Sequence, residues 1–73
     1  MREEQITTLF AEALGLRDIA PDDNFFDLGG HSLLASKLVR RIRAQFGVRI
    51  PLRRFYQAPT VSAVVRELDR LSA

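Results

Sequence analysis

Apolar residues recur with the period of an α-helix in three separate stretches, and this pattern limits the fold more than any other feature. The stretches cover residues 3–14, 32–46 and 61–71. Gly15 and Gly47 follow the first two stretches, where helices commonly end. The sequence therefore predicts an all-α fold with three principal helices.

The segments between these stretches predict one long loop and one short helix. Residues 15–31 are rich in turn-forming residues, and a connection of this length is uncommon unless it is functional or disordered. Apolar residues that could anchor it to a core are spread through it: Ile19, Phe25, Phe26 and Leu28. We therefore expect this first loop to be ordered and packed across the helices. Residues 52–56 predict a single short helix before Pro59.

The chain has to build its core without covalent help, because it has 73 residues and no cysteine. A chain of this size buries only about 60% of the surface that its unfolded form exposes. Its composition, 47% apolar and 27% charged, is that of a globular protein. We expect residues 1–73 to form a single domain with Phe10, Phe46 and Phe55 in the core. A catalytic cleft is hard to build at this length, which favours binding or carrying over catalysis.

The sequence offers no membrane signal. No apolar run approaches the roughly 18 residues of a membrane span. The charged first residues lead into no signal-peptide stretch. We therefore expect a soluble, cytoplasmic domain that contacts no membrane. As an isolated domain, it is also expected to be a monomer.

Positive charge is concentrated in residues 37–54, which hold seven of the eleven lysines and arginines. Such a stretch raises the question of a nucleic acid or an acidic protein as a partner. No asparagine or glutamine stands near the start of the second helix to read bases, and the preceding loop contains Asp22, Asp23 and Asp27. A small nucleic-acid-binding domain is therefore the weaker alternative, and we expect no nucleic-acid partner.

Ser32 is the residue with the clearest chemical potential. It follows two glycines and His31 and opens the second predicted helix. The start of a helix presents unpaired N–H groups and a partial positive charge, which stabilise a phosphate. The glycines could let the backbone of another molecule approach. The alternative is that Ser32 only caps the helix, because serine is a preferred cap.

Catalysis by Ser32 alone finds no support in the sequence. The nucleophile-elbow pattern requires a second glycine two residues after the serine, where this chain has Leu34. His31 is the only histidine, and as the immediate neighbour of Ser32 it is badly placed to act as its base. One histidine without cysteine also makes a poor zinc site, and the calcium-loop order of ligands is absent. The sequence predicts no catalytic residue and no metal site.

Residues 23–33, with the sequence DNFFDLGGHSL, closely resemble the core motif of peptidyl carrier (thiolation) domains of nonribosomal peptide synthetases. Residues 41–48 resemble the end of the second helix of that family. Residues 50–52 and 55–61 resemble its third helix and the entry to its last helix. The likeness covers nearly the whole chain and implies a small acyl-carrier-like helical bundle.

In that family a separate phosphopantetheinyl transferase takes the arm of coenzyme A and attaches it to the motif serine. The resemblance therefore implies that Ser32 carries covalent 4'-phosphopantetheine. It also implies a set of residues that flank the attachment site: Asp27, Leu28, Gly29, Gly30, His31 and Leu33. The terminal thiol of the arm then holds an aminoacyl or peptidyl group as a thioester. Adenylation, condensation and thioesterase-type domains are the implied partners of a carrier that has no catalysis of its own.

Two alternatives share this fold. One is an acyl carrier of a polyketide or hybrid pathway, but such carriers tend to be acidic and to have Asp-Ser-Leu at the site. This chain has His31, Ser32 and Leu33 there and an isoelectric point near 9.9, which favours the peptidyl branch. The other is a docking module in which Ser32 is never modified. Phosphopantetheinylation of Ser32 distinguishes the peptidyl carrier from this docking module and from a nucleic-acid-binding domain.

Some residues near Ser32 are candidates for a partner-facing surface. Leu33 breaks the apolar period of the second helix, and Lys37 and Arg40 fall on the same side. Of the adjacent Phe25 and Phe26, one is expected to anchor the loop and the other to be exposed near Ser32, but the sequence does not say which. We take Phe26, Leu33, Lys37 and Arg40 as the partner-facing candidates.

Overall fold

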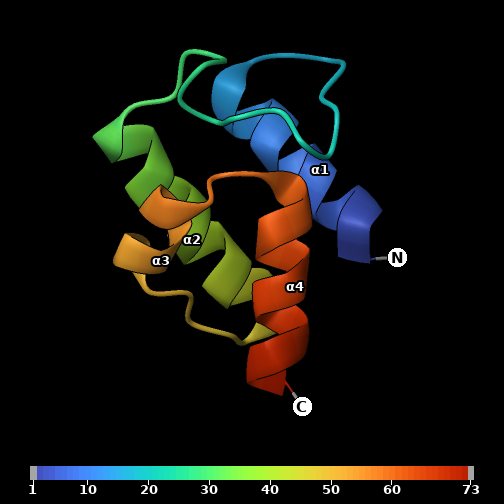
Figure 1. The fold of residues 1–73 in the computed structure, drawn as a ribbon, viewed down its shortest axis with the longest axis vertical. Helices are drawn as coiled ribbons and strands as arrows, with labels where there is room; N and C mark the ends of the chain where they lie inside the picture. Colours follow the sequence, from blue (N-terminus) through green and yellow to red (C-terminus); the bar gives the residue numbers. More distant parts are fainter. Residues whose placement is uncertain (1, 73) are drawn as a thin grey trace.

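Four helices make up the fold in the computed structural model, which describes residues 2–72. Figure 1 shows them in chain order as α1 (Arg2–Leu14), α2 (Ser32–Phe46), α3 (Leu52–Gln57) and α4 (Val61–Ser72). α1 packs against both α2 and α4, and the short α3 packs against α2. The predicted all-α bundle, with three principal helices and one short one, is confirmed. Met1 and Ala73, the ends of the predicted domain, lie outside the described residues.

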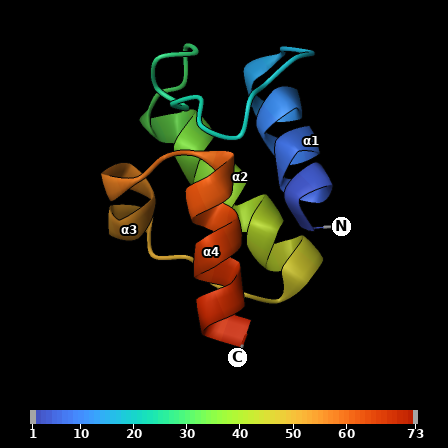
Figure 2. The same cartoon turned by 45° about the vertical axis from the view of Figure 1, so that its right-hand side comes forward.

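The long connection between α1 and α2 lies across one end of the bundle, near the start of α4 (Figure 2). Its backbone is hydrogen-bonded to the region where α4 begins. The Phe25 N–H donates to the Pro59 carbonyl oxygen at 2.8 Å, and the Ser62 N–H donates to the Pro21 carbonyl oxygen at 3.1 Å. The prediction of an ordered loop packed across the helices is confirmed.

The core is apolar throughout and takes side chains from every helix and from both long connections. Its buried members are Ile6, Leu9, Phe10, Phe25, Ala35, Leu38, Ile42, Ile50, Phe55, Val61, Val64 and Leu68. Phe10, Phe25 and Phe55 meet edge to face at its centre, with ring centroids 5.3–6.0 Å apart. Aromatic pairs of this kind add about 0.5–1.5 kcal/mol each beyond the burial of their surface.

Phe46 corrects one expectation about this core. It was expected inside together with Phe10 and Phe55, but its side chain is only partly buried against the rim of the cluster. Phe46 is the last residue of α2, directly before Gly47, which has a φ of +69° and ends the helix. At that end few elements are left to cover the ring.

Within residues 2–72, three ion pairs connect the helices at the surface. Arg2 pairs with Asp69 between α1 and α4, and Arg41 pairs with Glu12 between α2 and α1. The third pair joins Arg54 of α3 to Glu67 of α4. It connects these two helices where α3 has few other contacts. Across residues 2–72, no helix is both long and apolar enough to cross a membrane.

Candidate functional site

Ser32 is the first residue of α2, and its side chain is exposed. The residue in the capping position is His31, whose backbone is extended, with φ −146° and ψ 178°. Neither side chain makes a capping hydrogen bond, and the Ser32 hydroxyl has no partner within residues 2–72. The interpretation of Ser32 as a mere helix cap is therefore wrong. Its hydroxyl is free for chemistry.

The backbone around Ser32 is suited to a phosphate. The first hydrogen bond of α2 runs from the Ala35 N–H to the His31 carbonyl oxygen at 2.9 Å. The N–H groups of Ser32, Leu33 and Leu34 thus precede the helical ladder and find no acceptor in the described part of the chain. The first turn of α2 also contains no acidic residue. A phosphate ester on Ser32 would lie at the positive end of a helix of 15 residues, an arrangement typically worth about 0.3–1 kcal/mol.

The structure explains why glycine occupies the two positions before His31, which the sequence alone did not reveal. Gly29 has a φ of +104°, a conformation that other residues rarely adopt. Gly30 has no room for a side chain, since an added Cβ would overlap the Phe25 ring and lie 2.7 Å from the Phe25 carbonyl oxygen. The Gly30 N–H donates to that same oxygen at 3.0 Å. Gly30 is thus held in a tight turn packed on a core phenylalanine. The expected role of the two glycines, to let another molecule approach, stays a prediction.

The structure decides between the two adjacent phenylalanines. Phe25 is fully buried and anchors the loop. Phe26 is half-buried, and its ring lies 5.4 Å from the ring of Tyr56, which is 43% exposed. The Asn24 side-chain oxygen accepts hydrogen bonds from the N–H groups of Phe26 and Asp27 at 2.8 and 3.2 Å. Phe26 is therefore only partly exposed, and not exposed as a whole side chain.

The other candidate residues divide into exposed and half-buried ones. Leu33 is 60% exposed, the largest value among the exposed large apolar residues in the described chain. Lys37 and Arg40 are exposed one and two turns further along α2 and form no ion pair with any residue in the range 2–72. Among the flanking residues, Asp27 and His31 are exposed and Leu28 is half-buried.

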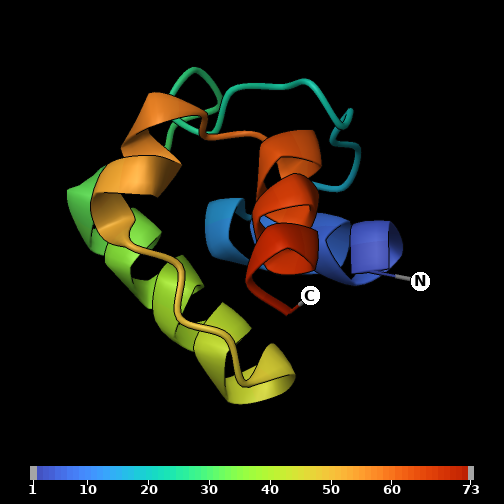
Figure 3. The same cartoon turned by 60° about the horizontal axis from the view of Figure 1, so that its bottom comes forward.

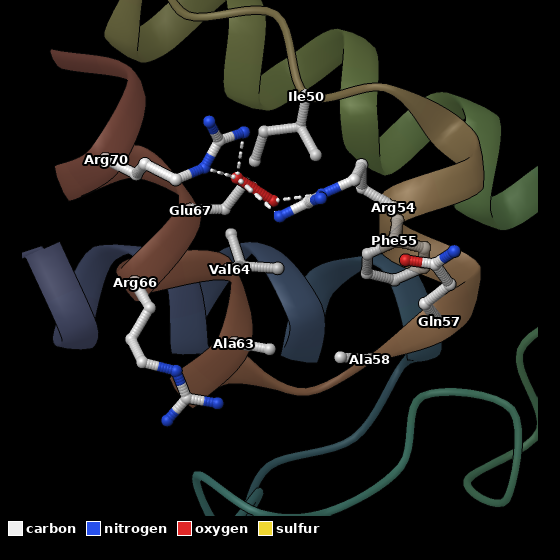
Figure 4. Close-up of a pocket in the computed structure, with 10 residues that line it drawn as sticks. All are labelled: Ile50, Arg54, Phe55, Gln57, Ala58, Ala63, Val64, Arg66, Glu67 and Arg70. Carbon is white, nitrogen blue, oxygen red and sulfur yellow. Dashed lines mark hydrogen bonds and ion pairs between the residues drawn. The ribbon is translucent and has the colours of Figure 1, made fainter.

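A separate hollow of about 250 Å³ lies between α3 and α4 (Figure 4). The carboxylate of Glu67 lies across it and accepts hydrogen bonds from Arg54 and Arg70 at 2.8 and 2.6 Å. The Arg54 hydrogen bond, followed by the Arg70 hydrogen bond, holds the pKa of Glu67 below its usual value, although desolvation acts in the opposite direction. In the sequence, only the spacing of Glu67 and Arg70 on one helix points to this cluster, and its contact with Arg54 could not be expected.

Comparison with known proteins agrees with the geometry. The family model described as "Phosphopantetheine attachment site" matches residues 4–68. The probable non-canonical nonribosomal peptide synthetase CymA of Salinispora arenicola is 54% identical over 67 residues, which is 92% of this chain and 1% of that protein. The chain spans between 1% and 6% of the length of the curated relatives it matches.

Two solved structures are close in fold. One is the complex of the phosphopantetheine transferase Sfp with coenzyme A and a peptidyl carrier protein, with a TM-score of 0.93, 27% identity and coverage of 96% of this chain and 91% of that chain. The other is the A-PCP structure of McyG with phenylalanyl-adenylate, with a TM-score of 0.87, 33% identity and coverage of 92% of this chain and 10% of that chain. Motif, fold and family model agree, and the chain belongs to the phosphopantetheine attachment site family, among its peptidyl carrier domains.

Proposed function

We propose that this chain is a carrier domain of nonribosomal peptide synthesis whose Ser32 bears 4'-phosphopantetheine. The observation that carries the proposal is the exposed Ser32 hydroxyl at the start of α2, inside the range that matches the family model. The arm, once attached, supplies a thiol that holds an aminoacyl or peptidyl group as a thioester. This role requires no cysteine in the chain, and there is none.

Attachment needs chemistry that this chain does not provide by itself. The Ser32 oxygen forms a bond to the pantetheine-side phosphorus of coenzyme A, and the bond between the two phosphates breaks. Adenosine 3',5'-bisphosphate leaves, and the hydroxyl proton passes to a base on the transferase. No side chain in residues 2–72 hydrogen-bonds to the Ser32 hydroxyl, so a base from outside fits the geometry. The domain supplies position and the free N–H groups near the phosphate.

The proposed partners follow from the same role. A phosphopantetheinyl transferase loads the arm, and an adenylation domain activates the amino acid that the thiol accepts. Condensation and thioesterase-type domains then consume the thioester. Phe26, Leu33, Lys37 and Arg40 are proposed to face these partners. Leu33, Lys37 and Arg40 are exposed on one side of α2, and Phe26 is partly exposed in the loop before Ser32. Within this scheme the domain is a monomer that binds and presents its cargo without catalysis.

The decisive test is the intact mass of the protein after incubation with coenzyme A and a broad-specificity transferase. We expect one phosphopantetheine per chain on the parent and none on Ser32→Ala. Ser36→Ala is the matched control, because Ser36 lies one turn further along the same helix, and this variant should be loaded like the parent. Loading of Ser32→Ala, or no loading of the parent, would show the assignment to be wrong.

A further inference from the structure

A groove with a volume of about 610 Å³ lies between α2 and the segment that leads into α3. Figure 3 shows that this segment and α3 run beside α2. Four exposed arginines line the groove: Arg40, Arg43, Arg49 and Arg53. Its apolar lining includes the buried Ile50 and the half-buried Val39 and Leu52. The groove therefore combines a cationic rim with apolar contact surface.

These four arginines have no counter-charge in the described chain. Other arginines of the same region do have one, since Arg41 pairs with Glu12 and Arg54 pairs with Glu67. None of the four lining arginines forms an ion pair with a residue in the range 2–72, and no acidic residue lines the groove. A concave surface lined by charge of one sign concentrates ions of the opposite sign. The groove is thus complementary to an anion.

The groove also begins next to the attachment site. Ser36 lines it and lies one helical turn after Ser32. From Ser32, the groove arginines on α2 lie roughly 12 Å and 16 Å along the helix axis, given the helical rise per residue. An extended phosphopantetheine arm is long enough to cover this span. A group tethered at Ser32 would meet the arginines at a high effective concentration, so that a weak contact is sufficient.

We propose that this groove receives a carboxylate of the thioester-bound cargo, so that the domain is adapted to acyl or aminoacyl groups with a free acidic end. The inference rests on the proposed attachment at Ser32. An arginine guanidinium donates two parallel hydrogen bonds to a carboxylate, and Val39 and Leu52 offer contacts to the methylene groups of the cargo. Because the arginines are exposed, the contact is weak and reversible, as release to a partner requires.

The size of the groove favours cargo over a protein segment. Its volume of about 610 Å³ lies within the range of small-molecule sites, roughly 300–1,000 Å³. An acidic segment of a partner protein is the competing occupant. Binding of such a segment would depend on the charge of the groove but not on the charge of the cargo. The experiment therefore varies the charge of the cargo to distinguish cargo from a partner segment.

The experiment compares two cargoes on the same arm. The transferase loads the full chain from coenzyme A analogues that end in a stable succinyl group or in its neutral amide counterpart, succinamyl. Only protein shown by mass to be fully loaded is compared, so that a failure of loading, which would contradict attachment at Ser32, is seen separately. Nitrogen-15 NMR then follows the backbone amides and the arginine Nε–H groups.

The succinyl form should shift the Nε–H signals of the groove arginines relative to the succinamyl form, and added salt should reduce the shifts. Arg43→Gln and Arg53→Gln should lose most of the charge-dependent shifts at the remaining groove residues. Arg17→Gln, which removes an exposed loop arginine outside the groove, should keep them.

Identical spectra for the two cargoes would overturn the proposal. The proposal also fails if Arg43→Gln and Arg53→Gln slow only the reactions with partner proteins and leave the cargo-dependent shifts intact. That second outcome would assign the groove to an acidic partner segment instead.

Discussion

The loop before Ser32 and the groove beside α3 border the same helix, yet opposite kinds of interaction shape them. The loop is fixed by the buried Phe25, by the close packing of Gly30 and by hydrogen bonds to Pro59 and Asn24. The groove is lined by exposed arginines with no ion-pair partner in residues 2–72. The contrast teaches that the part of the domain that positions Ser32 is distinct from the part whose charges are free to bind another group. Apolar packing holds Ser32, the proposed attachment residue, in place, while the groove arginines keep their charge available to an anionic group nearby.

The largest effect on stability is expected from Phe25→Ala. The ring of Phe25 is fully buried and contacts the rings of Phe10 and Phe55. Removal of a buried phenylalanine typically costs about 3–5 kcal/mol. Much of the stability of a domain this small would therefore be lost in urea unfolding. Phe26→Ala is the matched control and should cost clearly less, because Phe26 is only half-buried. Equal losses for the two variants would contradict the assignment of Phe25 as the anchor.

Gly30→Ala tests the same region with one methyl group. The new Cβ would meet the Phe25 ring and carbonyl oxygen at distances that no unstrained contact allows. Overpacking of this kind typically costs about 1–3 kcal/mol, and it should also displace the start of α2. We expect a lower urea midpoint together with slower loading of Ser32 by the transferase. A parent-like midpoint would mean that the loop yields easily, against the rigid support inferred here.

Glu67→Gln tests the ion pairs that connect α3 and α4. Glu67 binds Arg54 of α3 and Arg70 of α4, and its side chain is only 10% exposed. We expect a modest decrease in melting temperature, smaller than that of Gly30→Ala. Glu12→Gln, which removes a pair with both partners well exposed, should have a smaller effect still.

The effect of Glu67 should also depend on pH in a definite direction. The pKa of Glu67 is lowered in the folded state, with the Arg54 hydrogen bond as the largest cause. A group with a lowered folded pKa contributes stability above its unfolded pKa and loses it as the pH falls through the folded value. The difference in melting temperature between the parent and Glu67→Gln should therefore shrink below the ordinary value of 4.5. A constant difference from neutral to strongly acidic pH would contradict this role of the carboxylate.

The smallest effect on stability, with a larger one on function, is expected from Leu33→Ala. Leu33 is 60% exposed, so its truncation should change the unfolding free energy by less than about 0.5 kcal/mol. Loss of a partner contact of about 1 kcal/mol would lower kcat/KM for loading roughly five-fold. Lys37→Glu should also slow loading, most strongly at low salt. Leu71→Ala, at an exposed leucine of α4, is the control that should load normally. Unchanged loading of both α2 variants would make this face ordinary solvent-exposed surface.

Much of this arrangement could be predicted from the sequence because it depends on short-range pattern. The period of the apolar residues predicted the helices, and the motif around Ser32 predicted the family to which the chain belongs. The choice between Phe25 and Phe26 could not be made, because adjacent residues in an irregular loop have no periodicity to orient them. The role of Gly30 was missed for a related reason, since the carbonyl and ring that crowd it belong to a loop residue five positions away.

The groove could not be predicted from the sequence, because segments that are separate in the sequence come together to form it. Arg49 and Arg53 join Arg40 and Arg43 only because the segment after Gly47 turns back along α2. In the sequence these residues formed part of one long basic stretch, and nothing separated them from the neighbouring Arg41 and Arg54. Those two have ion-pair partners far away in the chain, Glu12 and Glu67, which sequence spacing does not reveal.

The hydrogen bonds between the first loop and the region of Pro59 and Ser62 limit when the loop can complete its folding during protein synthesis. The Phe25 N–H and the Pro21 carbonyl oxygen find their partners more than thirty residues later in the chain. While a ribosome is still producing those later residues, the loop lacks these bonds, and contacts of such long range form late in folding. We therefore expect Ser32 to reach its final geometry only after the start of α4 has left the ribosome. A transferase that recognises the folded loop should then modify complete domains and not unfinished ones.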